Sequence, residues 1–86
     1  MRHRWSEEDD IVALYFYKFG MLDRSPSIDA VGQSRGMGTD SLRMRVENFR
    51  AIDAGGSLDH AAQQSRAVFQ NYAHLSEPEL RILAGI

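Results

Sequence analysis

The apolar residues of this 86-residue chain recur at the spacing of α-helices, and this spacing restricts the chain to a helical fold. The stretches between them are short and contain the glycine, serine and proline residues that end helices and begin new ones. No stretch shows the two-residue alternation of a strand. We therefore predict an all-α fold. A single domain over residues 1–86 is expected, because a chain this short buries only about 60 to 65 % of its unfolded surface.

The first two expected helices have clear start and stop signals. Ser6 can cap a helix whose first turn holds the four acids at residues 7–10, which suit the positive end of the helix dipole. Gly20 is its natural end. A second, short helix is expected after Ser25 as its cap, with Pro26 at the first helical position, where a missing N–H does no harm.

Three further helices follow in the second half of the chain. Thr39 can cap a helix through Asp53 that buries a stripe of apolar residues at helical spacing: Leu42, Val46 and Phe49. Ser57 can cap a fourth helix to about Tyr72, and "SEPE" at residues 76–79 has the spacing of a capping box for a fifth. We expect residues 6–53 to form a tri-helical, helix-turn-helix-like core, with one or two additional helices from residues 57–86.

Composition and spacing give no sign of an active site. The chain has no cysteine, and its histidines at positions 3, 60 and 74 have no metal-ligand spacing. We expect no catalytic residue, no metal, no cofactor and no enzyme. The longest apolar run, residues 11–17, is far below the roughly 20 residues that span a bilayer, and no secretory signal is visible. A cytoplasmic protein without membrane contact is expected.

Several motifs occur in a recognisable order. Arg4 and Trp5 precede two acids, "ALY" follows at residues 13–15, and "SLRMRVENF" occupies residues 41–49. Over residues 4–72 this order resembles a small helical domain at the N-terminus of many HNH-type and other restriction endonucleases. The resemblance implies a Myb-like or helix-turn-helix unit that helps its parent enzymes hold DNA. The chain departs from them in ending before any nuclease domain, and in having "SRGMGTDS" before the third helix.

Double-stranded DNA is therefore one predicted partner, for a regulator or targeting unit. In a helix-turn-helix the second helix of the pair enters the major groove, where arginine suits guanine and asparagine suits adenine. We expect residues 1–5 to form a flexible basic arm, which either reaches a minor groove, as homeodomain arms do, or is an ordinary chain terminus. The candidate DNA contacts on the third helix, the preceding turn and this arm are Arg35, Thr39, Ser41, Arg43, Arg45, Asn48, Arg50, Arg2 and Arg4.

A protein partner or a homodimer of the same fold is the alternative. The net charge is −2, and Asp40 and Glu47 occupy the most exposed line of the third helix, where they can pair with its arginines on an ordinary solvated surface. The C-terminal apolar residues, from Leu80 to Ile86, can pack in the core or form a dimer seam. A continuous positive surface clear of Glu47 would favour DNA, whereas salt-bridged arginines and exposed apolar side chains would favour protein.

Overall fold

The computed structural model describes residues 4–23, 25–55 and 63–86, and over these residues it confirms the all-α prediction. The described residues form five helices and no strand. The helices are α1 (Glu7–Phe19), α2 (Ile28–Ser34), α3 (Thr39–Asp53), α4 (Gln63–Tyr72) and α5 (Glu77–Ala84). Within the described residues, none of the helices combines the length and apolar character needed to cross a bilayer.

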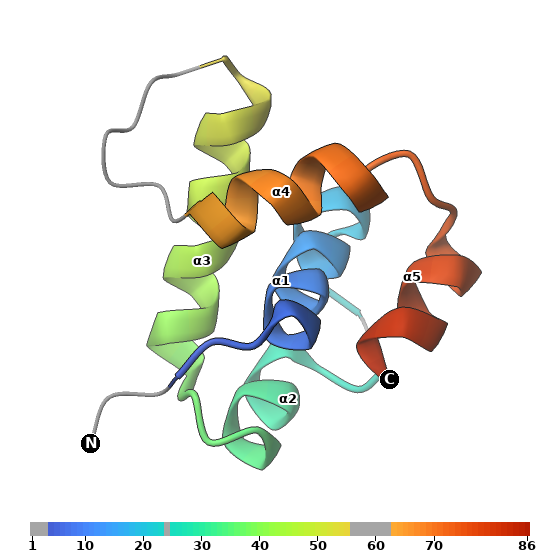
Figure 1. The fold of residues 1–86 in the computed structure, drawn as a ribbon. Helices are drawn as coiled ribbons and strands as arrows, with labels where there is room; N and C mark the ends of the chain where they lie inside the picture. Colours follow the sequence, from blue (N-terminus) through green and yellow to red (C-terminus); the bar gives the residue numbers. More distant parts are fainter. Residues whose placement is uncertain (1–3, 24, 56–62) are drawn as a thin grey trace.

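Helix α1 is the centre of the fold. It packs against α3, α4 and α5, while α2 packs against α3 (Figure 1). Every residue of α1 from Asp9 to Phe16 is buried, so this helix is enclosed on almost all sides. The core around it is completed by side chains of the other helices and of one turn, including Ile28, Met37, Leu42, Phe49, Val68 and Leu80.

Two helices begin where the sequence predicts, with Ser6 and Ser76 as their caps. The Ser6 hydroxyl accepts a hydrogen bond from the Asp9 N–H (3.1 Å), and the Asp9 carboxylate accepts one from the Ser6 N–H (3.1 Å). Ser76 and Glu79 form the same reciprocal pair at the start of α5. Gly20 ends α1, again as predicted.

Two predicted caps were wrong. Ser27, not Ser25, caps α2, because its hydroxyl accepts from the Ala30 N–H at 3.1 Å and places Ile28 in the first helical turn, where it is buried. Gly38, not Thr39, occupies the N-cap position of α3, and this helix has no side-chain cap hydrogen bond. The predicted cap Ser57 lies outside the described residues.

The link between α2 and α3 holds one buried side chain and two glycines with positive φ. Met37 is buried within this four-residue turn, between Gly36 (φ +72°) and Gly38 (φ +78°). The N–H groups of Met37 and Gly38 both donate to the Gly32 carbonyl, at 3.0 and 3.1 Å, and so close the end of α2. Beyond the turn, α3 buries Leu42, Val46 and Phe49, which confirms the predicted apolar stripe. The opposite side of α3 is left to solvent.

Candidate functional site

The outward side of α3 gathers charged residues around an exposed methionine. We call this surface the α3 face and define it by five residues: Asp40, Arg43, Met44, Glu47 and Arg50. At 100° per residue these positions share the side of the helix that points away from the buried stripe. Met44 is 70 % exposed, and among the described residues it is the large apolar side chain that α3 leaves open to solvent. Ser41 is also exposed beside it.

Both arginines of the α3 face are paired with carboxylates. Arg50 Nε donates to Glu47 Oε2 at 3.0 Å, and this pair has the i, i+3 spacing of neighbours on one helix face. Arg43 Nη2 instead donates to Asp29 Oδ1 of α2 at 3.1 Å. All four side chains are roughly half exposed or more. Exposed pairs of this kind contribute little to stability, typically about 0 to 1 kcal/mol, so these arginines can change partner easily.

Arg45 points the other way, into the protein. Its Nε and Nη2 donate to the two carboxylate oxygens of Asp10 at 2.7 and 2.9 Å, and its guanidinium lies 4.5 Å from the centre of the Trp5 ring. Asp10 is fully buried and also accepts hydrogen bonds from Ser65 Oγ (2.8 Å) and Gln64 Nε2 (2.5 Å). A buried carboxylate needs such partners, and these four bonds tie α1 to both α3 and α4.

Arg35 also serves an internal contact. Its guanidinium bonds to Asp9 at 3.0 Å and Glu8 at 2.8 Å at the start of α1, and to the Ala84 carbonyl at 2.5 Å near the end of α5. Only about 20 % of this side chain is exposed. Arg35 thus joins the α2–α3 turn to α1 and α5.

The structure does not bring all the predicted DNA contacts to one surface. Ser41, Arg43 and Arg50 lie on or beside the outward side of α3, whereas Arg35 and Arg45 are held by carboxylates of α1. The others are spread over several environments: Asn48 is half-buried, Arg4 is exposed, and Arg2 and the side chain of Thr39 lie outside the described structure.

Sequence reasoning missed the role of Asp9 and Asp10 as partners of these arginines. It interpreted all four acids only as favourable charges at a helix N-terminus. One signal was present, because Asp10 precedes Leu14 by one helical turn and so falls on an apolar side of α1. A carboxylate at such a position needs a buried donor, but nothing in the spacing identifies Arg45, 35 residues away.

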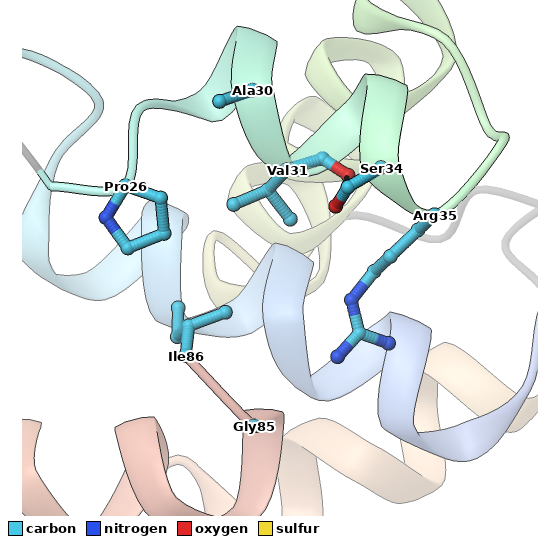
Figure 2. Close-up of a pocket in the computed structure, with 7 residues that line it drawn as sticks. All are labelled: Pro26, Ala30, Val31, Ser34, Arg35, Gly85 and Ile86. Atoms are coloured by element: carbon cyan, nitrogen blue, oxygen red, sulfur yellow. Dashed lines mark hydrogen bonds between the residues drawn. The ribbon is translucent and has the colours of Figure 1, made fainter.

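A shallow groove of about 420 Å³ lies between α2 and the end of α5 (Figure 2). The Arg35 guanidinium at one edge already bonds to Asp9, Glu8 and Ala84, and the Ser34 hydroxyl donates to the Val31 carbonyl at 3.2 Å. The groove therefore suits an apolar side chain better than a charged ligand. Its lining is Pro26, Ala30, Val31, Ser34, Arg35, Gly85 and Ile86.

The shifted pKa values belong to contacts that hold helices together or cap them. A hydrogen bond to Asp53 raises the pKa of Tyr17, and a hydrogen bond to Glu7 raises that of Tyr72. The Ser76 backbone N–H lowers the pKa of Glu79. Across the described ranges, no three histidine or acidic side chains lie close enough to hold a metal ion.

Comparisons with known protein families, with curated proteins and with solved structures found no match to this chain. Its function must therefore be inferred from the arrangement of its own side chains. The α3 face is the surface on which the predicted partners, DNA or protein, can be weighed against each other.

Proposed function

We propose that this chain is a small helical interaction module that self-associates through the α3 face. The observation that carries this proposal is the 70 % exposure of Met44 within a helix surface of balanced charge. Methionine is a flexible, polarisable side chain that adapts to the surface of a protein partner. Exposed apolar side chains rimmed by charged residues are typical of such contact surfaces.

The charge balance on α3 favours protein over nucleic acid. Asp40 and Glu47 offset Arg43 and Arg50, and Asp29 of α2 adds a further negative charge beside Arg43. DNA-binding surfaces need a local surplus of positive charge, because most of their affinity comes from neutralised phosphates. The cations that would supply such a surplus near α3, Arg35 and Arg45, are occupied by carboxylates of α1.

Sedimentation of the purified chain at increasing concentration tests this proposal. We expect the average mass to rise towards that of a dimer, and Met44→Glu to shift this rise to higher concentration by about tenfold or more, because it places a charge in the contact. Ile82→Glu is the matched control, since Ile82 is 79 % exposed on α5, away from the α3 face. A chain that remains monomeric throughout would contradict self-association.

DNA binding by a helix-turn-helix unit is the second candidate. It is supported by the contact of α2 with α3 across a four-residue turn with a buried methionine, and by the resemblance of residues 4–72 to the N-terminal domain of HNH-type endonucleases. Arg43 and Arg50, with 46 and 60 % of their side chains exposed, are its best phosphate or base contacts.

Fluorescence anisotropy of a labelled duplex distinguishes the two candidates. DNA binding predicts a dissociation constant of about 10⁻⁶ M or tighter at low salt, weakened by added salt and by the double variant Arg43→Ala, Arg50→Ala. Arg45 is unsuitable for this test, because its removal would disturb the buried Asp10. No binding at low salt would exclude the DNA candidate and leave the protein partner.

A further inference from the structure

The charged residues of the α3 face alternate in sign along the helix. Asp40 is negative, Arg43 positive, Glu47 negative and Arg50 positive. The outer residues, Asp40 and Arg50, each lie five positions from Arg45. The inner residues, Arg43 and Glu47, each lie two positions from it. In each of these two pairs the residues have opposite charges and lie equally far from Arg45, one before it and one after it.

This order matches the requirement of one particular assembly. When two identical helices pack antiparallel about a two-fold axis, one position of the helix lies level with the axis. A residue that precedes this position by a given number of residues then faces, on the partner, the residue that follows it by the same number. With the axis level with position 45, Arg43 of one copy meets Glu47 of the other, and Asp40 meets Arg50. Each pairing forms twice, so the dimer contains four attractive contacts.

We propose that the partner of the α3 face is a second copy of this chain, with the two α3 helices antiparallel and the two-fold axis beside position 45. The inference rests on the proposed function and specifies its partner and geometry. Met44 lies one position from the axis, so the two methionines meet at the centre of the contact. An apolar centre with charged flanks is the usual arrangement of a helix pair.

Two alternative arrangements of the same helices bring like charges together. In a parallel pair each residue faces the same residue of the other copy, so that Asp40 faces Asp40 and Arg43 faces Arg43. An antiparallel pair centred on Glu47 brings the two Glu47 carboxylates together. Like charges in a contact disfavour these two arrangements, whereas the register centred on position 45 pairs all four charged residues of the α3 face with residues of opposite sign.

Forming the dimer requires only small changes within each copy. Arg43 exchanges or shares its exposed contact with Asp29, and Arg50 does the same with Glu47. The contact is limited to one helix per copy, well below the roughly 800 Å² per partner of a standard interface. We therefore expect a weak dimer, with a dissociation constant of about 10⁻⁵ to 10⁻⁴ M, that is weakened further by salt.

Charge reversal on two separate copies tests this geometry. Arg43→Glu places two carboxylates against each other in its homodimer, and Glu47→Arg places two guanidinium groups together. Each variant alone should dissociate about tenfold more readily than the wild type, or more. In an equimolar mixture the new glutamate of one copy meets the new arginine of the other. The mixture should therefore recover association to within about threefold of the wild type.

Sedimentation equilibrium of the two variants, their mixture and the double variant Arg43→Glu, Glu47→Arg supplies the readout. The double variant should also recover, because both signs are exchanged in the same chain. Circular dichroism checks that every variant is folded, which is expected because both side chains are about half exposed or more. Restored association in both the mixture and the double variant would support the proposed register.

Three other results would each overturn part or all of this account. Self-association that Met44→Glu weakens, but that mixing the reversed variants does not restore, would overturn the register while leaving the proposed function standing. Self-association lost on Ile82→Glu instead would place the contact on α5 and overturn both. A wild-type chain that stays monomeric would also overturn both proposals.

Discussion

Arg45 and Asp10 form a two-point hydrogen-bonded ion pair, with N···O distances of 2.7 and 2.9 Å, inside a fold of 86 residues. The pair divides the cations of α3 into two groups. Arg45 is turned inward and holds α3 on α1, whereas Arg43 and Arg50 are turned outward and remain open to a partner. This division is the reason that arginines in one helix are expected to respond differently to substitution.

Arg45→Met should strongly destabilise the protein, because it leaves the Asp10 carboxylate buried without its cation. We expect a loss of about 3 to 5 kcal/mol in the free energy of unfolding, measured by urea denaturation followed by circular dichroism. Arg50→Met is the matched control and should change stability by only about 0.5 kcal/mol, because its pair with Glu47 is exposed.

A double variant separates the charge effect from lost packing. Asp10→Asn together with Arg45→Met leaves no buried charge, while the amide oxygen can still accept from Ser65. It should recover part of the stability lost in Arg45→Met. Equal stability of the Arg45→Met and Arg50→Met variants would show that the buried pair is not important to the fold.

Gly38→Ala should destabilise the turn before α3. Gly38 has φ +78° and ψ +152°, a region open almost only to glycine, and an added Cβ would meet no atom within 4 Å. The expected loss of about 1 to 3 kcal/mol therefore comes from backbone strain alone. Ser41→Ala, an exposed change in the first turn of the same helix, is the control for thermal or urea denaturation and should be nearly neutral.

Tyr15→Phe should weaken the attachment of α5 to α1. The buried Tyr15 hydroxyl donates to Glu77 Oε2 at 2.9 Å and accepts from Arg81 Nη1 at 3.0 Å. Loss of these bonds to two charged groups should lower stability by about 1 to 3 kcal/mol in urea denaturation. Tyr72→Phe, which removes a surface hydrogen bond to Glu7, should have a smaller effect, and an equal or larger one would contradict this explanation.

The cap of α5 should weaken as the pH falls. The Ser76 backbone N–H, and next its hydroxyl, lower the pKa of Glu79 below its ordinary value of 4.5. Because the pKa is lower in the folded state, the cap stabilises the protein above the unfolded pKa and loses this effect as pH falls through the folded pKa.

NMR titration of the Glu79 carboxyl carbon measures this shift directly. We expect a midpoint below 4.5 in the wild type. Ser76→Ala should raise it only part of the way, because the backbone N–H remains. A wild-type midpoint at or above 4.5 would contradict the proposed cap.

The sequence predicted the features of this fold that depend on local spacing. The capping residues Ser6 and Ser76, the stop at Gly20 and the buried face of α3 follow from patterns within one or two helical turns. The cap of α2 was misplaced by two residues, because Ser25 and Ser27 both offer a hydroxyl and only packing of Ile28 distinguishes them.

The candidate site depended on contacts between distant parts of the chain, and these were harder to predict. A helical wheel alone leaves Arg45 on a flank where it can face either solvent or the core. Only the position of α1 shows that Asp10, 35 residues earlier, takes up its charge. The charge order of the α3 face was visible in the sequence, but its importance depends on knowing that this side of α3 is exposed.

A single cysteine at position 44 gives the most direct test of the α3 contact. The chain has no cysteine of its own, so in Met44→Cys a disulfide can form only between two copies. With the helices antiparallel about position 45, the two new thiols lie close to the axis and can approach to disulfide distance. Under mild oxidation at equal concentrations, we expect Met44→Cys to form a covalent dimer in high yield and Ile82→Cys, on exposed α5, to form little. Equal or lower cross-linking of Met44→Cys would contradict self-association through the α3 face.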